Sequence, residues 1–378
     1  MSLIYNEEQQ LLRDSARAFL NQNGPVARLR SARDTRHAGG VPDQLWRQMA
    51  DMGWAGIVIG EEHGGLDFGF IGAGVLCEEM GRTLTVAPLL SSALVSATLL
   101  RAMGSAAQRQ LLESIATGDV TVAPALDERP RHDLRATATR ATRTDSGYRL
   151  DGRKTLVPDG CAAGYLLVLA RSAAEPGAAD GLGLFLVKAD SAGVGIERTQ
   201  LADHHDWAEI RLNAVKVTAD ALVGGEGKAY GPVDACLDRA RICVAAMLLG
   251  ISSEVFERTL AYVKERKQFG VPVGSFQALQ HRAAQLFCEI ELLKSLVLRA
   301  LQAADEGAEE LPLLASAAKT KACRTARLAV NEAVQMHGGM GMTDEFDIGF
   351  FMKRAASLQQ LYGDSYAMED RFASLKDY

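Results

Sequence analysis

The sequence predicts a three-domain protein in which a β domain separates two helical domains. Helical apolar spacing extends over residues 1–118, short alternating apolar runs over 119–226, and long helical segments over 227–378. The chain has 378 residues, 48% of them hydrophobic and 23% charged, which is enough for two or three globular domains. We therefore expect an N-terminal α-helical domain, a middle β domain and a C-terminal helical bundle.

The N-terminal domain is predicted from helix caps and from the spacing of its apolar residues. Asn6 is a suitable N-cap, and Leu11 and Phe19 fall on one face of the helix that follows it. Pro42 suits the first position of a second helix, which Gly53 is expected to end. Further helical segments are expected over residues 70–82, 88–103 and 105–117.

The middle domain differs from the C-terminal domain in the length of its apolar segments. Short runs flanked by Gly, Asp and Pro predict strands at 165–170, 182–187, 210–212 and 215–217. One long helix is expected over 234–264, and Ser275 is expected to cap the next. Pro312 suits the start of a third helix, and two more are expected at 346–361 and after Asp364. Long helices with short connections favour an antiparallel bundle.

Composition excludes several classes of function. The net charge of −6 provides no overall basic field for nucleic acid, so an anionic ligand has to be bound by local cations. Charges interrupt the longest apolar stretches, so no membrane span is expected. The six cysteines lack C-x-x-C spacing, which predicts free thiols in a reducing compartment, with the cytoplasm as the expected location. The triplet His204-His205-Asp206 has no further ligands nearby, so no metal site is expected.

Two segments at predicted helix ends have residues that suit an anionic ligand. In residues 265–270, with the sequence ERKQFG, Arg266 can contact a pyrophosphate through two hydrogen bonds and Phe269 can cover a planar ring. In residues 335–339, with the sequence QMHGG, the glycines allow a ligand to approach the backbone. On spacing alone, both segments also fit ordinary helix ends, where cations and glycines are common.

Two further segments carry charged side chains. Asp364, in the sequence YGDS, is either the N-cap of the last helix or a carboxylate base at a helix junction. Residues 238–241, with the sequence DRAR, have by themselves the pattern of a solvated charged face on the long helix.

Taken together, these segments resemble the signatures of the acyl-CoA dehydrogenase family. Residues 262–280, YVKERKQFGVPVGSFQALQ, are similar to its strongest signature, and residues 333–343, AVQMHGGMGMT, to its second. The resemblance covers essentially the whole chain and implies the family's fold: an N-terminal α-helical domain, a middle β domain and a C-terminal four-helix bundle. Within the family, the GLGLFLV run from Gly181 and the LYGD sequence at 361–364 are most similar to the small subunit of pimeloyl-CoA dehydrogenase.

The resemblance implies FAD as the cofactor and an acyl-CoA thioester as the substrate. The FAD pyrophosphate and adenosine of a neighbouring subunit, in a dimer or tetramer, would be bound by Arg266, Gln268, Phe269, Gln335, Gly338 and Gly339. The other implied cofactor contacts are Leu126, Leu156, Val157 and Ser365, and the implied substrate contacts are Asp238, Arg241, Tyr362 and His132. A carboxylate would take the α-proton, a hydride would pass from the β-carbon to the flavin, and electron-transfer flavoprotein would receive the electrons.

The sequence departs from the family at the residues that would perform this chemistry. The usual base position matches Gly363 and a second known position matches Ala240, so the candidate base is Asp364. The Gly363 N–H is the candidate donor to the thioester carbonyl. Beside the flavin ring, hydroxyl-bearing and aromatic residues of the family are replaced by Leu126, His132 and residues 156–158, with the sequence LVP.

Two functions from different classes follow. In the first, the chain is a working flavoenzyme subunit with Asp364 as its base. In the second, it is a non-catalytic partner that completes the FAD site of a larger homologous subunit through Arg266 and Gln335. Acyl-CoA oxidation by oxygen and flavin-dependent monooxygenation are further chemistries of the same fold.

Overall fold

The computed structural model describes residues 4–35 and 43–378 and divides the chain into two compact units. Unit 1 contains Met1–Arg30, Phe70–Thr85 and Arg241–Tyr378, and unit 2 contains Ser31–Gly69 and Val86–Ala240. Each unit therefore combines segments that are distant in the sequence. The residues that we predicted as one N-terminal domain, 1–118, contribute to both units.

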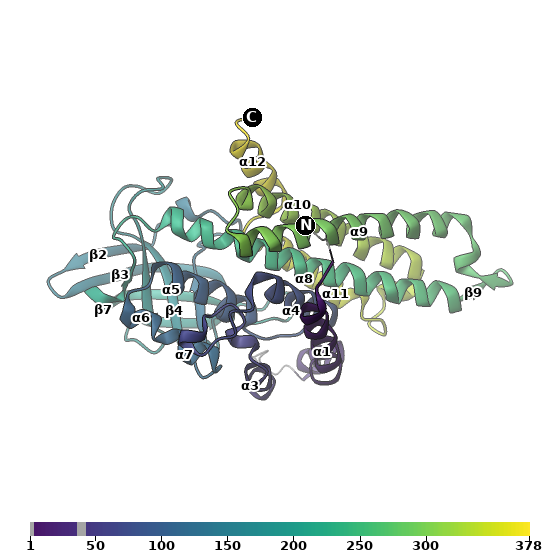
Figure 1. Ribbon diagram of the computed structural model, residues 1–378, viewed down its shortest axis with the longest axis horizontal. Coiled ribbons are helices and arrows are strands. Elements are labelled where there is room, and N and C mark those ends of the chain that lie inside the picture. Colours follow the sequence, from purple (N-terminus) through teal and green to yellow (C-terminus); the bar gives the residue numbers. More distant parts are fainter. Residues whose placement is uncertain (1–3, 36–42) are drawn as a thin grey trace. The chain divides into compact units, whose positions relative to one another are not determined.

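Unit 2 is built on one eight-stranded sheet with the order β6-β7-β3-β2-β4-β5-β8, in which β1 pairs with β4. Figure 1 shows β2, β3, β4 and β7 within this sheet. The strands are β1 (Val122–Ala125), β2 (Arg140–Thr144), β3 (Gly147–Pro158), β4 (Tyr165–Arg171), β5 (Leu182–Lys188), β6 (Val194–Arg198), β7 (Trp207–Thr218) and β8 (Leu222–Val223). The rings of Tyr148 and Phe185 meet edge-on in its core, with their centroids 5.0 Å apart.

The two short strands predicted at 210–212 and 215–217 are one strand, β7. It pairs with β3 on both sides of a register shift between Leu150 and Gly152. At the shift Ala214 adopts a φ of +52°, and its N–H donates to the Asp151 carboxylate at 2.8 Å. The strand continues through the irregularity because the Asp151 carboxylate accepts the hydrogen bond of the Ala214 N–H in place of a backbone carbonyl of β3.

The helices of unit 2 are short. They are α3 (Asp43–Asp51), a π-helical segment at Leu89–Ser96, α5 (Ala97–Met103), α6 (Ala106–Arg109) and α7 (Leu111–Ala116). Helix α2 (Val26–Asp34) has residues in both units. Gly53, with a φ of +79°, follows α3 closely, as expected, whereas the prediction for Pro42 lies outside the described residues.

Unit 1 is helical, and Figure 1 shows its long helices α9 and α10 running alongside each other. Its helices are α1 (Glu7–Asn23), α9 (Gln277–Glu306), α10 (Leu311–His337), α11 (Ile348–Gln360) and α12 (Ser365–Leu375). Helix α4 (Gly69–Thr83) lies in unit 1 except for its first residue, and α8 (Tyr230–Glu265) begins in unit 2 and continues in unit 1 from Arg241. Two predicted starts are confirmed. Asn6 forms a capping box with Gln9, and Pro312 lies in the first turn of α10.

The predicted cap of α9 is wrong. A small hairpin of β9 (Lys267–Gln268) and β10 (Val271–Pro272) joins α8 to α9 and continues into a 3₁₀ turn at Val273–Ser275. The Ser275 hydroxyl donates to Pro272 O at 2.7 Å, and Phe276 is the N-cap residue. The serine therefore stabilises the turn before the helix.

Helices α4 and α8 approach each other closely because glycines face backbone atoms. A Cβ on Gly250 would lie 1.9 Å from Glu78 O, and one on Gly81 would lie 2.2 Å from Met247 O. Both distances are too short for any side chain. Over residues 4–35 and 43–378, no helix is both long enough and apolar enough to pass through a bilayer.

Candidate functional site

The hairpin between α8 and α9 presents a cation and an aromatic ring to solvent. The Arg266 N–H donates to Tyr262 O at 2.8 Å, which continues the hydrogen bonding of α8. Phe269 and Gly270 form the tip, with φ values of +56° and +84°. The Phe269 side chain is 91% exposed, and its ring contacts Phe276 edge-on. This corner is therefore an ordered hairpin and not a plain helix end.

A second exposed segment lies at the end of α10. Gln335, Gly338 and Gly339 are exposed, and Gly338 adopts a φ of +60° and a ψ of −141°. Glycine reaches this conformation readily. A Cβ on Gly338 or Gly339 would meet nothing within 4 Å, so crowding inside the chain does not require glycine there. The segment leaves room for a ligand to approach the backbone.

Tyr262 and His337 bring these two segments together. Their rings stack with centroids 4.3 Å apart, and the Tyr262 hydroxyl donates to His337 O at 3.3 Å. Burial lowers the pKa of His337, although its hydrogen bond with the Ala333 carbonyl raises it, so the neutral ring is favoured. Because Tyr262 lies one helical turn before Arg266, the hairpin and the glycine segment lie at the same end of unit 1. An exposed guanidinium, two amides and an open glycine backbone fit the phosphates of a dinucleotide.

The turn between α11 and α12 holds the candidate base. Tyr362 and Gly363 have φ values of +58° and +112°. The Asp364 carboxylate accepts from Ala367 N at 2.8 Å, so its predicted alternative role as an N-cap is confirmed. The Gly363 N–H donates to Gln360 O at 3.3 Å. A substrate carbonyl that used this N–H would have to share or displace that contact.

Two buried cations contact the same turn. Arg241 Nε donates to Tyr362 O at 3.1 Å, and Lys319 Nζ donates to Gly363 O at 2.8 Å. Lys319 was not among the site residues predicted from the sequence. The signal for it is a lysine on the apolar face of α10, in helical register with Ala315 and Ala322, both of which are buried. Ser365 opens α12 just beyond the turn.

The prediction of a solvated charged face at 238–241 is wrong for two of its residues. Asp238 and Arg241 are each only 2% exposed. Burial of ionised side chains requires compensating partners, and the Tyr362 carbonyl is one for Arg241. Asp238 and Arg241, which were predicted to contact the substrate, are therefore buried side chains.

The residues predicted beside the flavin ring are in unit 2. Leu126 and Val157 are buried, and Leu156 is half-buried with a φ of +51°. Near them, His132 Nδ1 lies 2.9 Å from the Asp127 carboxylate. The Thr155 N–H donates to Asp127 O at 2.9 Å, which connects this pair to β3.

A buried ion pair supports the same part of unit 2. Lys154 Nζ donates to Leu126 O at 3.1 Å and to the Glu128 carboxylate at 2.7 Å. Burial lowers the pKa of Lys154, and the Glu128 carboxylate opposes this only in part. Burial raises the pKa of Glu128. The Lys154 ammonium and the hydrogen bonds from Thr139 and Ala138 lower this pKa by more, so it lies below its usual range.

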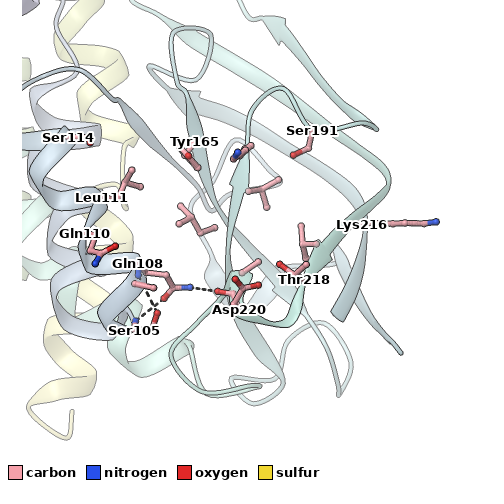
Figure 2. Close-up of a pocket in the computed structure, with 16 residues that line it drawn as sticks. Ser105, Gln108, Gln110, Leu111, Ser114, Tyr165, Ser191, Lys216, Thr218 and Asp220 are labelled. Carbon is pink, nitrogen blue, oxygen red and sulfur yellow. Dashed lines mark hydrogen bonds between the residues drawn. The ribbon is translucent and has the colours of Figure 1, made fainter. Parts of the chain in front are cut away.

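Unit 2 also contains a cavity of about 600 Å³ between α6, α7 and strands of the sheet. Figure 2 shows Leu111 and Tyr165 on its walls and Lys216 extending away from it. The Gln108 side chain donates to Asp220 O at 2.7 Å at its edge. None of the predicted site residues lies among its lining residues.

Comparison with known proteins identifies the family. The acyl-CoA dehydrogenase N-terminal, middle and C-terminal domain models match residues 6–119, 127–215 and 232–373. The chain is 30% identical over 368 residues to the probable acyl-CoA dehydrogenase YngJ of Bacillus subtilis, with 95% of each protein covered.

Two solved structures are similar over nearly the whole chain. A variant of the Tcur3481-Tcur3483 steroid ACAD is 32% identical, with a TM-score of 0.87 and 98% of each chain covered. Butyryl-CoA dehydrogenase from Megasphaera elsdenii is 26% identical, with a TM-score of 0.91 and 100% of each chain covered. The chain therefore belongs to the acyl-CoA dehydrogenase family, whose members are FAD-dependent oxidoreductases acting on CH–CH bonds.

Proposed function

We propose that this chain binds FAD, dehydrogenates an acyl-CoA thioester between its α- and β-carbons, and passes the electrons to electron-transfer flavoprotein. The observation that carries the proposal is the exposed group at one end of unit 1, consisting of Arg266, Gln268, Phe269, Gln335, Gly338 and Gly339. FAD, when bound, supplies the hydride acceptor. The remaining steps are assigned to side chains and backbone groups of the protein.

The exposed group would hold the phosphates and adenosine of FAD. Arg266 is permanently charged, and its planar guanidinium can donate two parallel hydrogen bonds to a pyrophosphate. Gly338 and Gly339 allow a phosphate to approach the backbone, because no Cβ occupies the space beside them. Phe269 is 91% exposed, which is unusual for a large apolar side chain that has no partner outside its own chain. We therefore assign this group to the FAD of a neighbouring subunit.

Asp364 is the proposed base for the α-proton. Its hydrogen bond with Ala367 N occupies one acceptor position, and a carboxylate has about four. The Gly363 N–H is proposed to donate to the thioester carbonyl and so polarise it. To do this it would give up its hydrogen bond to Gln360 O, which at 3.3 Å is already long. The predicted substrate contacts are Asp238, Arg241, Tyr362 and His132.

A second candidate function is that of a non-catalytic partner of a larger homologous subunit. The specific observation in its favour is that Asp364 and the Gly363 N–H both have hydrogen-bond partners within the chain. The similar steroid ACAD is named Tcur3481-Tcur3483. On this alternative, Arg266 and Gln335 complete the FAD site of the other subunit, and the turn at 362–364 has a structural role only.

The visible spectrum of the purified chain distinguishes the two functions. A yellow protein with about one FAD per chain supports the first, and a colourless protein that gains flavin only with a larger partner supports the second. The R266Q variant should lose most of its FAD because the pyrophosphate loses its guanidinium. If R266Q retains FAD as the wild type does, the assignment of this end of unit 1 to the cofactor is wrong.

A further inference from the structure

The turn between α11 and α12 is held in a strained shape. Tyr362 has a φ of +58°, a value that a bulky residue adopts only at an energetic cost. Gly363 follows it with a φ of +112°. A strained backbone persists only where its surroundings hold it. The groups that hold this turn therefore determine the orientation of Asp364, the residue that follows it.

Two buried cations from two different helices hold consecutive carbonyls of the turn. Arg241 of α8 donates to Tyr362 O at 3.1 Å. Lys319 of α10 donates to Gly363 O at 2.8 Å and to Gln359 O, in the last turn of α11, at 2.9 Å. Arg241 is 2% exposed and Lys319 is fully buried. Buried ammonium groups are rare unless they are paired, so the carbonyls are the main compensation for Lys319.

The planarity of the peptide bond links these contacts to the groups that would perform the chemistry. In a trans peptide the C=O and the following N–H lie in one plane and point in opposite directions. The hydrogen bond from Arg241 to Tyr362 O therefore fixes the plane that carries the Gly363 N–H. The hydrogen bond from Lys319 to Gly363 O fixes the plane that leads into Asp364. A cation on a carbonyl also polarises the N–H of the same peptide and makes it a better donor.

Other charges near Lys319 agree with this arrangement. Burial lowers the pKa of Lys319, the neighbouring Cys323 and Asp364 raise it, and Arg241 lowers it. Lys319 Nζ also lies 3.5 Å from Cys323 Sγ. Lys319 therefore interacts electrostatically with both Arg241 and Asp364.

We propose that Lys319 and Arg241 are positioning residues that together fix the two peptide planes from Tyr362 to Asp364, and through them the Gly363 N–H and the Asp364 carboxylate. This inference rests on the proposed function, in which Asp364 removes the α-proton. Lys319 reaches substrate only through the turn. Its loss should therefore slow the chemical step and leave acyl-CoA binding nearly unchanged.

The test compares K319M, which keeps the length of the side chain and removes its charge, with K321M as a matched control. Lys321 lies on the same helix and pairs with Glu289 of α9, not with a carbonyl of the turn. The first measurement is hydrogen exchange of the amides at 361–367 without substrate. We expect about tenfold faster exchange in K319M and no change in K321M, because one charged hydrogen bond to the turn is lost.

The second measurement is steady-state kinetics of the holoenzymes with an acyl-CoA. We expect kcat to fall about 100-fold in K319M with KM within about twofold, since a shift of about 1 Å in a catalytic group has effects of this size. A raised KM with unchanged kcat, or unchanged exchange, overturns the proposal. If the wild-type chain never reduces its flavin, the proposed function fails, and the exchange measurement still decides whether Lys319 holds the turn. R241K, which keeps the charge with a shorter reach, should lie between the wild type and K319M in the exchange measurement, which is made without substrate.

Discussion

At the scale of single residues, Asp364 combines a structural and a chemical role. Its carboxylate caps α12 through Ala367 N, and its remaining acceptor positions are those proposed to take the α-proton. The two roles can be separated because asparagine is as good an N-cap as aspartate but is not a base.

We expect D364N to keep the stability of the protein and to lose its activity. The rate of flavin reduction should fall about 100- to 10,000-fold, the usual contribution of a general base. D364A should lose activity to the same extent and also about 1 kcal/mol of stability, because the cap is removed. Rapid-mixing absorbance and urea unfolding measure the two effects. Flavin reduction by D364N at the wild-type rate would exclude Asp364 as the base.

The Lys154–Glu128 pair predicts a pH dependence of stability in the acid range. The pKa of Glu128 is lower in the folded protein than in the unfolded chain. Below the unfolded pKa the unfolded state therefore binds more protons, and the free energy of unfolding decreases. Its contribution is therefore fully present above about pH 4.3 and is lost as the pH falls through the folded pKa.

We expect E128Q to be less stable than the wild type by about 2 kcal/mol at pH 7, since a charged hydrogen bond to buried Lys154 is lost. This difference should shrink as the pH falls below about 4, and unfolding in urea at several pH values measures it. D145N removes an exposed carboxylate of unit 2 and is the control. A difference between wild type and E128Q that stays constant down to pH 3 would contradict this account.

At the scale of helices and strands, periodicity predicted most elements, and the failures have local causes. The runs at 210–212 and 215–217 looked like two strands because Asn213 and Ala214 interrupt the alternation, but the Asp151 carboxylate stabilises the irregularity. Ser275 has the residue type of an N-cap, yet its hydroxyl donates to Pro272 O. The first contact depends on tertiary structure and the second on the local turn, and neither leaves a periodic signal.

The predicted site divides in the same way. Arg266 and Gln335 were predicted as cofactor contacts because they belong to long segments that resemble family signatures. Lys319 was not, because a lysine within an apolar pattern is compatible with an exposed position, and only the carbonyls of the turn at 362–363 explain its burial. Sequence patterns identify residue types, whereas the partners of a buried charge come from packing.

The glycine contact between α4 and α8 gives a prediction at this scale. G250A places a Cβ 1.9 Å from Glu78 O, so the helices have to separate, and we expect a loss of about 2 kcal/mol or more. G349A, in α11, meets nothing within 4 Å and should be neutral or stabilising by about 0.5–1 kcal/mol. Thermal and urea unfolding of both variants provide the measurement. Equal stabilities for the two would show that the helices do not pack as described.

At the scale of the whole molecule, the exposed end of unit 1 predicts an oligomer in which subunits share FAD. Phe269 is 91% exposed within one chain, and Arg266 beside it is also exposed. If a second subunit covers them, F269A should weaken both self-association and FAD retention, by about tenfold each for the loss of a large apolar contact. R143Q, on an exposed arginine of β2, is the control.

Analytical ultracentrifugation at several protein concentrations, together with the ratio of flavin to protein absorbance, measures this prediction. A coupled loss of association and of FAD supports a shared site. Weakened association with full FAD retention would place the cofactor within a single chain.

The most direct test of the central claim is the anaerobic addition of an acyl-CoA to the purified flavoprotein while its visible spectrum is recorded. Butyryl-CoA and a CoA thioester of a steroid side chain are suitable probes, and D364N is the matched control. The proposed function predicts that the yellow absorbance of the wild type bleaches with at least one of these thioesters and that D364N stays yellow. A wild-type protein that stays yellow with both, and bleaches only after a larger subunit is added, would contradict it.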